Sequence, residues 1–258
     1  MEIGLNLFSI RNLLKTEEEF LDTAIKLKEA GYSYMQLSGA PSDPQLVKRV
    51  VEGSGLPIYL THMPMTRIID DTEALMEEHA VYGCKNIGLG AMPAENIVNP
   101  ELGKPVIEKL NAAGEKMARN GYKFFYHHHH FELYKWGDET VLEYMIKNAP
   151  YINFTVDTYW LQHGGADVCD TLDKLNGRCE CVHLKDYKVE AKEKENGGYS
   201  FNPTFAPLGD GNMDFKKIVK KMEEIGTKYY FVEQDNAANL PDTLNQVIRS
   251  VNYAKKEL

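Results

Sequence analysis

Four stretches of the chain decide its fold: FFYHHHHFEL (residues 124–133), INFTVDTYW (152–160), CVHLKDY (181–187) and YYFVEQD (229–235). Each is an apolar run, rich in aromatic or β-branched residues, that stops at His, Asp or Glu. Short runs of this kind are typical of buried strands. The intervals between them are long enough for helices, so the strands are expected to run the same way and to bring their polar ends to one face. In a parallel barrel that face carries the chemistry.

Strand-like and helix-like segments alternate along the rest of the chain as well. The expected strands are residues 3–9, 32–37, 56–61, 85–89, 122–127, 152–156, 180–184 and 229–233. The expected helices are residues 17–30, 44–54, 71–82, 100–120, 140–148, 168–175, 214–225 and 241–256. Eight strand–helix units predict an α/β protein, a (β/α)8 TIM barrel that forms a single domain over residues 1–258.

Composition narrows the classes of function. The 258 residues carry a formal net charge of -9, which disfavours nucleic-acid binding because phosphate contacts need clustered Lys and Arg. No apolar run approaches the length of a membrane span, and MEIGLNLFSIRN lacks the features of a secretion signal. The scattered cysteines, Cys84, Cys169, Cys179 and Cys181, are expected to be reduced. We therefore expect a cytoplasmic protein with no nucleic-acid or membrane partner.

The strand ends also predict a metal site. Because strand side chains alternate with a period of two, Asp157, His183 and Glu233 can share the inner face of the barrel at its C-terminal rim. Glu132, after the fifth strand, would complete the set. Three carboxylates and one imidazole suit one divalent ion, namely Mn, Co, Zn, Fe or Mg, and are too rich in oxygen for a structural zinc site.

Several motifs resemble those of the sugar phosphate isomerase/epimerase superfamily, the xylose isomerase-like TIM barrels. They are YHHHHFEL (126–133), DTYW (157–160) with GGAD (164–167), HLKD (183–186), PLGDGNMDF (207–215) and VEQD (232–235), together with GLNLFSIRN and GYSYMQLSG near the N-terminus. The resemblance covers nearly the whole chain. The first block departs from the family pattern Y-H-N-H-x-x-E-F at His128 and Leu133.

The resemblance implies that Glu132, Asp157, His183 and Glu233 hold the metal. It also selects His127 and His129 from the histidine run as the pair that enters the barrel, which leaves His128 and His130 outside it or in a loop.

Four further residues near the strand ends each have two possible roles. His62 ends a strand and is either a structural histidine or a substrate contact. Lys185 either pairs with Asp186 or Asp157 or binds a substrate oxygen. Trp160 and Phe8 form an apolar wall against a sugar ring or belong to the core.

The expected activity is that of a divalent-metal-dependent isomerase or epimerase of carbohydrate metabolism, acting on a sugar or sugar-like polyol through an enediolate. Glu132 and Glu233 would move the proton, with His127 or His129 as acid or base. The alternative is a lyase or dehydratase that uses the same enolate of a keto-sugar, keto-inositol or 3-keto-glycoside.

Two rivals from other classes are an endonuclease of the same superfamily, which the acidic charge disfavours, and a non-catalytic sugar-binding barrel. The absence of a glycine-rich phosphate cradle favours an unphosphorylated substrate. The sequence is also compatible with a homo-oligomer. The polar stretch 188–202 follows the seventh strand and is either a solvated loop or a lid over the active face.

Overall fold

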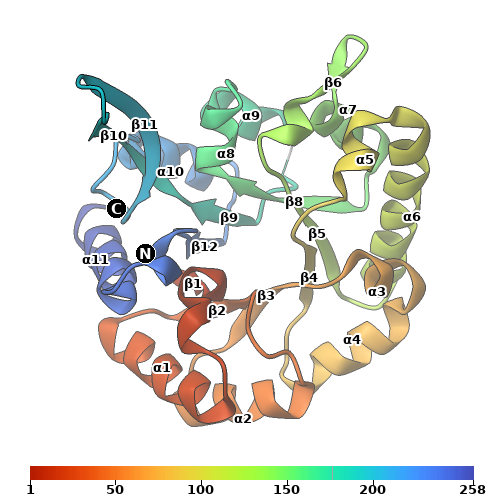
Figure 1. The fold of residues 1–258 in the computed structure, drawn as a ribbon. Coiled ribbons are helices and arrows are strands. Elements are labelled where there is room, and N and C mark those ends of the chain that lie inside the picture. The colour runs from red at the N-terminus through yellow and green to blue at the C-terminus, as the bar shows by residue number, and fades with distance from the viewer. Residues whose placement is uncertain (176) are drawn as a thin grey trace.

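The computed structural model describes residues 1–175 and 177–258, and within them eight parallel strands close into a barrel (Figure 1). Around the barrel their order is β1 (Gly4–Asn6), β12 (Tyr229–Val232), β9 (Cys181–Leu184), β8 (Ile152–Asp157), β5 (Lys123–His127), β4 (Asn86–Leu89), β3 (Ile58–His62) and β2 (Tyr34–Leu37). The predicted (β/α)8 barrel is confirmed.

Helices surround the barrel (Figure 1). The eight that were expected are α1 (Glu17–Ala30), α2 (Pro44–Ser54), α4 (Thr72–Val81), α6 (Pro100–Arg119), α7 (Val141–Asn148), α9 (Val168–Lys174), α10 (Phe215–Glu224) and α11 (Thr243–Glu257). Shorter helices not expected from the sequence are α3 (Met65–Asp70), α5 (Ala94–Val98), α8 (Thr158–His163), η1 (Leu7–Leu13), η2 (Phe131–Leu133) and η3 (Ala237–Asn239).

Local chemistry explains where α1 begins and ends. The Thr16 side chain accepts from the backbone N–H of Glu19, and the Glu19 side chain accepts from the N–H of Thr16, which satisfies two unpaired donors of the first turn. At the other end Gly31 has φ 103°, a left-handed conformation that glycine adopts without strain.

The first strand is shorter than expected. The apolar run 3–9 was predicted to be one strand, but β1 ends at Asn6 and the chain then turns into η1. The reason is that the Asn6 side chain accepts from the backbone N–H of Phe8 and so caps the helical turn.

The interior of the barrel changes character along its axis. Its floor is an apolar cluster of Tyr34, Leu60, Phe125, Cys181 and Phe231, contributed by five different strands. Gly4 makes room for it, since a Cβ there would lie 2.2 Å from the Tyr34 ring. One pleat further toward the C-terminal ends, the inward positions become polar.

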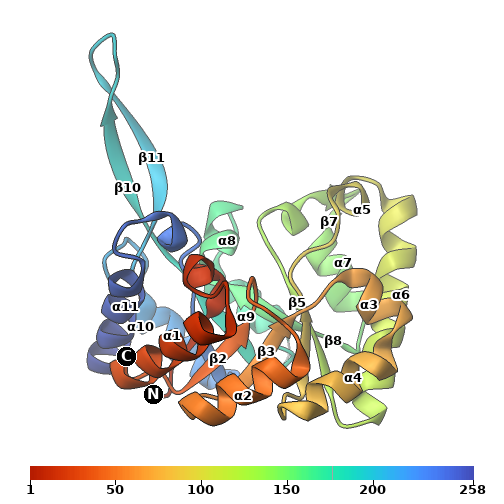
Figure 2. The same cartoon turned by 60° about the horizontal axis from the view of Figure 1, so that its bottom comes forward.

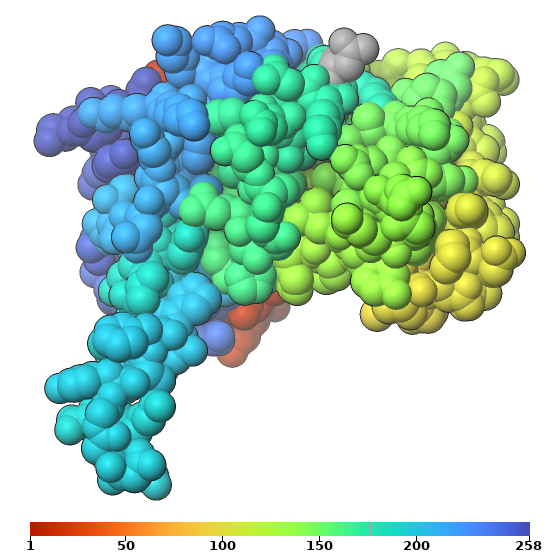
Figure 3. Space-filling model, turned by 90° about the horizontal axis from the view of Figure 1, so that it is seen from above, coloured from red at the N-terminus to blue at the C-terminus, as the bar shows by residue number. Residues whose placement is uncertain are grey.

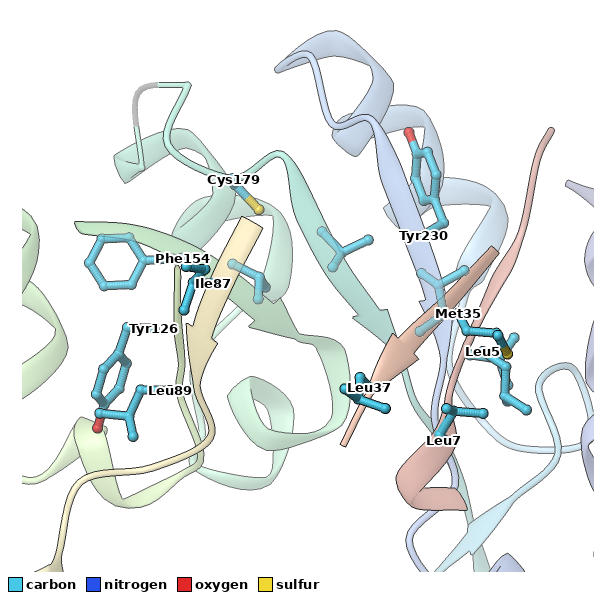
Figure 4. Packing of buried hydrophobic residues seen from close by; sticks show 14 of the residues in the cluster. Leu5, Leu7, Met35, Leu37, Ile87, Leu89, Tyr126, Phe154, Cys179 and Tyr230 are labelled. Carbon is cyan, nitrogen blue, oxygen red and sulfur yellow. The ribbon is translucent and has the colours of Figure 1, made fainter. Parts of the chain in front are cut away.

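The outward faces of the same strands form the main core. Leu5, Met35, Ile87 and Phe154 belong to one large buried cluster that the strands share with the surrounding helices (Figure 4). With apolar layers on both sides, the strands are held firmly enough to fix the polar groups at their ends.

Two hairpins interrupt the regular pattern. A small one pairs β6 (Lys135–Trp136) with β7 (Glu139–Thr140), and a long one pairs β10 (Asp186–Glu193) with β11 (Tyr199–Ala206). The long hairpin projects from the C-terminal face of the barrel (Figure 2). The stretch 188–202 is solvent-exposed, as expected, but it is mostly regular strand and not an irregular loop.

Within the described ranges, no helix combines the length and the apolar character needed to cross a bilayer.

His79 on α4 is a buried histidine that ties this helix to the barrel. Its Nε2 lies 2.8 Å from the Thr61 hydroxyl of β3, and its Nδ1 lies 2.7 Å from the Leu75 carbonyl. The carbonyl can only accept, so Nδ1 carries the hydrogen and Nε2 accepts from Thr61. Burial lowers the pKa of His79 to about 4, so the ring is neutral in the folded protein.

This pKa predicts a pH-dependent contribution to stability. In the unfolded state His79 binds a proton near pH 6.5, whereas in the folded state it does so only near pH 4. As the pH falls through this window, protonation stabilises the unfolded state, so the free energy of unfolding decreases. From pH 7 to pH 5, wild type should lose about 2 kcal/mol of unfolding free energy more than the variant His79→Gln. Urea unfolding of both proteins at a series of pH values measures this, and identical pH slopes would contradict it.

Candidate metal centre and active site

Four buried side chains converge at the polar end of the barrel interior: His127, Asp157, His183 and Glu233. They stand at the ends of β5, β8, β9 and β12, which are consecutive around the barrel. Asp157 and His183 are register partners, so their side chains lie at the same level. Each residue offers one ligand atom, and these four atoms all lie within 4.8 Å of one another.

The short distances within this cluster are not all hydrogen bonds. His183 Nδ1 is 2.7 Å from Glu233 Oε2 and 3.7 Å from Asp157 Oδ2, while His127 Nε2 is 3.4 Å from Asp157 Oδ2. Yet His183 Nδ1 and Glu233 Oε2 are both buried without a hydrogen-bond partner. Buried polar atoms without a hydrogen-bond partner are rare in folded proteins and need an explanation. A bound cation would explain them, because these atoms are suitable metal ligands. Two imidazoles and two carboxylates suit divalent ions such as Mn, Fe, Co or Zn.

The cluster is strongly charged. Burial raises the carboxyl pKa values of Asp157 and Glu233, but Lys185 and His183 outweigh this and hold both well below their usual range. Burial likewise opposes the charge on His183, but Glu233 and Asp157 raise its pKa to about 9. The Lys185 ammonium lies 2.9 Å from Asp157, 3.2 Å from Glu233 and 3.0 Å from Asp235. The site therefore holds ionised carboxylates in a nearly dry environment.

Glu132, the fourth expected ligand, does not join this group, and His127 occupies the corresponding place. The strand β5 ends at His127, and Glu132 lies five residues on, in η2. Its carboxylate accepts from the Tyr126 hydroxyl at 2.5 Å and from the backbone N–H of His129 at 2.7 Å. Burial raises the pKa of Glu132 to about 7, although these two hydrogen bonds act in the opposite direction and lower it. The two-residue alternation of side chains in a strand does not apply to Glu132, because β5 has already ended at His127.

The four histidines are divided much as expected. His127 and His129 both line the cavity above the cluster. His128 is buried on the other side of the strand end, where its Nε2 accepts from the backbone N–H of Asp157 at 3.2 Å. His130 is exposed.

The cavity above the cluster has a volume of about 260 Å³. It is smaller than the roughly 300–1,000 Å³ of sites for drug-sized ligands, which suits a single sugar-sized ring. Phe8, His62 and Lys185 line it, while Trp160 stands behind them, with its ring centroid 5.3 Å from that of His129 and 5.1 Å from Lys185 Nζ. The full lining is Phe8, Ser38, His62, Gly90, Ala91, His127, His129, Lys185, Glu233 and Asp235.

The sequence analysis did not predict that Gln36 on β2 and Ser38 after it would hold two of these histidines. Gln36 Oε1 lies 2.7 Å from His183 Nε2, and Gln36 Nε2 lies 2.9 Å from His62 Nε2. Since the amide oxygen accepts, His183 donates through Nε2 and turns Nδ1 toward the cluster. His62 Nδ1 then faces Ser38 at 3.3 Å. Asn6, on β1, similarly donates to Glu233 Oε1 at 2.9 Å.

A signal for these residues existed. Asn6 and Gln36 are amides within otherwise apolar strands, GLN and YMQL, at positions that the two-residue period turns inward.

Comparison with known proteins agrees with this architecture. Residues 25–254 match the family model described as xylose isomerase-like TIM barrel. Among curated proteins, an inosose dehydratase of Clostridium perfringens is 25% identical over 95% of this chain and 92% of its own length. An inosose dehydratase of Klebsiella pneumoniae subsp. pneumoniae is 26% identical over 88% of this chain and 87% of its own length.

Solved structures show the same fold. A sugar phosphate isomerase/epimerase from Parabacteroides distasonis superposes with a TM-score of 0.79 at 22% identity, covering 99% of this chain and 94% of that one. A 3-keto-D-glucoside 4-epimerase from E. coli gives 0.67 at 14% identity, covering 99% of both chains. The comparisons support an enzyme and leave its reaction type open between isomerase, epimerase and lyase. The resemblance in the sequence motifs is confirmed, and the chain belongs to the xylose isomerase-like TIM barrel family.

Proposed function

We propose that this protein is a divalent-metal-dependent enzyme that removes the proton next to the carbonyl of a cyclic keto-polyol or keto-sugar and then expels a hydroxyl group as water. The observation that carries this proposal is the buried cluster of His127, Asp157, His183 and Glu233 beneath a sugar-sized cavity. Removing this proton leaves negative charge on the neighbouring carbonyl oxygen, and that charge must be stabilised. A purely hydrophobic pocket cannot stabilise it.

The four cluster residues would hold the metal, with Mn, Zn, Co, Fe or Mg as candidates. When bound, such an ion supplies Lewis acidity at a substrate carbonyl oxygen. Around it the protein supplies orientation. Gln36 fixes His183, and Asn6 fixes Glu233, so that both ligands are held before any ion arrives.

His129 is the proton carrier that the geometry supports best. It lines the cavity, and its Nδ1 is buried without a hydrogen-bond partner. Its ring lies against Phe131 with 4.8 Å between centroids, which sets its orientation. We assign Glu132 to positioning, because it holds the His129 backbone N–H, and Glu233 to the metal rather than to proton transfer. His127 likewise serves as a ligand.

The remaining wall residues would bind the substrate. Lys185 keeps its charge among three carboxylates and can donate a hydrogen bond to a substrate oxygen. His62 and Phe8 border the same cavity, and Trp160 supports the wall behind His129.

The names of the curated relatives favour dehydration over the isomerisation or epimerisation that the sequence first suggested. The atoms balance with one proton carrier. His129 takes the proton from the carbon next to the carbonyl, the hydroxyl on the following carbon leaves, and the same proton completes the departing water. No oxidant or reductant is required.

The setting fits a small-molecule enzyme of the cytoplasm. Cys84, Cys169, Cys179 and Cys181 are free, as in most proteins of reducing compartments. The net charge of -9 disfavours the endonuclease reading.

Metal binding distinguishes the cluster found in the structure from the set expected in the sequence. Protein stripped with a chelator should bind one Mn²⁺ or Zn²⁺ per chain by calorimetry. His127→Ala and His183→Ala should weaken binding by about 100-fold or more, since each removes a ligand, whereas Glu132→Gln should change it by less than about 10-fold. The proposal is wrong if His127→Ala binds like wild type and Glu132→Gln does not.

Turnover tests the reaction type. In D₂O, metal-loaded protein should convert inosose into its dehydrated product. NMR measures this loss of water from the substrate. His129→Phe should lower kcat by about 10²–10⁴-fold at unchanged metal stoichiometry, because it removes the proton carrier and keeps an aromatic ring. The neighbouring His130→Phe is the matched control and should act like wild type. Deuterated epimer or isomer without loss of water would replace dehydratase by epimerase or isomerase, and no conversion of inosose or a panel of keto-sugars would refute the enzyme.

A further inference from the structure

The β10–β11 hairpin lies outside the closed barrel as a separate two-stranded sheet. Its strands pair from Asp186 opposite Ala206 to Glu193 opposite Tyr199, so eight residue pairs extend away from the barrel mouth. Figure 3 shows the outer part of the hairpin standing clear of the rest of the molecule. Eight pairs correspond to a ribbon of about 26 Å.

The two faces of this ribbon differ sharply. The register puts one set of side chains on a face we call the aromatic face: Tyr187, Val189, Ala191, Glu193, Tyr199, Phe201, Pro203 and Phe205, with Glu193 as its one charged member at the outer end. The opposite face carries Asp186, Lys188, Glu190, Lys192, Ser200, Asn202, Thr204 and Ala206, with Asp186 and Ala206 at the buried base. On the aromatic face, Val189 near the middle of the ribbon is 57% exposed, and Tyr199 and Phe201 toward its outer end are 62% and 68% exposed.

Among the residues that the structure describes, the rings of the aromatic face have aromatic partners only at its base. Tyr187 and Phe205 both pack on Tyr159 of α8, with ring centroids 5.2 and 4.8 Å away. A two-stranded ribbon is marginally stable in water unless its apolar side packs against something. A long, exposed apolar ribbon is also a hazard for aggregation, so its outer half indicates an interface.

The base is also fixed, which argues against a lid that swings down over its own cavity. The Asp186 carboxylate accepts from the backbone N–H groups of Gly209, Gly211 and Met213 at 3.0, 3.0 and 3.3 Å. These bonds tie the start of β10 to the loop after β11. Closure would have to break them together with the packing on Tyr159.

A second exposed apolar patch lies on the same end of the barrel. We call it the rim patch: Val98, Leu102 and Tyr134, which are 58%, 48% and 50% exposed. Their segments adjoin, since Trp136 Nε1 donates to the carbonyl of Ile97 at 2.7 Å. They follow β4 and β5, so they border the mouth from which the hairpin rises (Figure 2).

We propose that the aromatic face of the hairpin docks on the rim patch of a second copy of this chain, in a two-fold symmetric dimer. Two-fold symmetry makes each chain both donor and acceptor, so the contact occurs twice. One hairpin on one patch covers about 650 Å² of apolar surface in all, no more than a crystal-packing contact, whereas the symmetric pair covers about 1,300 Å², within the range of stable dimers. A single contact with an unrelated protein lacks this doubling.

Charge does not oppose this pairing. Beyond the buried Asp186 at its base, the hairpin and its turn carry Lys188, Lys192 and Lys194 against Glu190, Glu193 and Glu195, so the projecting arm is neutral although the chain carries -9. The dimer would also place two hairpins around each barrel mouth, next to the cavity.

The oligomeric state of the full chain tests the proposal. In light scattering and sedimentation of wild type over about 1–100 μM, the measured mass should rise with concentration toward twice the chain mass of 29.3 kDa. Phe201→Asp should raise the dimer Kd by about 100-fold or more, because it places a charge in the buried centre of the contact. Ser200→Asp is the matched control: it adds the same charge one residue away, on the opposite face beside Lys192, and should leave the Kd unchanged.

The rim patch is tested separately. Leu102→Asp should weaken the dimer as Phe201→Asp does, while circular dichroism and thermal unfolding show that both variants fold. A monomeric wild type at 100 μM, or equal effects of Phe201→Asp and Ser200→Asp, would overturn the proposal. A dimer broken by Phe201→Asp and untouched by Leu102→Asp would also overturn it, since the hairpin would then have another acceptor.

Discussion

Two ionised carboxylates, Asp157 and Glu233, are buried side by side beneath the cavity, and the rest of the site follows from the need to neutralise them. Isolated charges cost too much in such surroundings. Lys185 and His183 supply the compensating charge, and Asn6 occupies the other oxygen of Glu233. A site that keeps so much negative charge away from water is organised around cations. The four ligand atoms lie within 4.8 Å of one another, close enough for one divalent ion to join them.

The barrel makes this arrangement possible by changing its contents along its axis. An aromatic floor, including Tyr34, Phe125 and Phe231, excludes water from below. The next inward positions on the same strands are Gln36, His127 and Glu233. Each strand thus serves twice, first as a wall of the apolar core and then as the support of one functional group. The rigidity of the packed lower layer is what fixes the upper one.

Much of this could be predicted from the sequence. The alternation of apolar runs with amphipathic segments gave the barrel, and the two-residue period placed Asp157, His183 and Glu233 on one face, as they are found. The period fails where the strand ends, which is why Glu132 was expected in the cluster although η2 carries it to Tyr126 and His129. Gln36 and Asn6 were overlooked because an inward amide marks a polar position without saying which side chain it holds, and the partners, His183 and Glu233, lie far away in the sequence. The hairpin was missed because its polar face dominates the composition of residues 188–202, and only pairing reveals the apolar face.

The central claim, that two histidines and two carboxylates form one cation site, is tested most directly by counting the imidazoles bound to the metal. Electron spin-echo spectroscopy of the Mn²⁺-loaded protein, with histidine labelled by ¹⁵N, reports nitrogen nuclei coupled to the ion. Two coupled imidazoles, reduced to one in His127→Ala, are the predicted result. A single imidazole in the wild-type protein, unaffected by His127→Ala, would contradict the account.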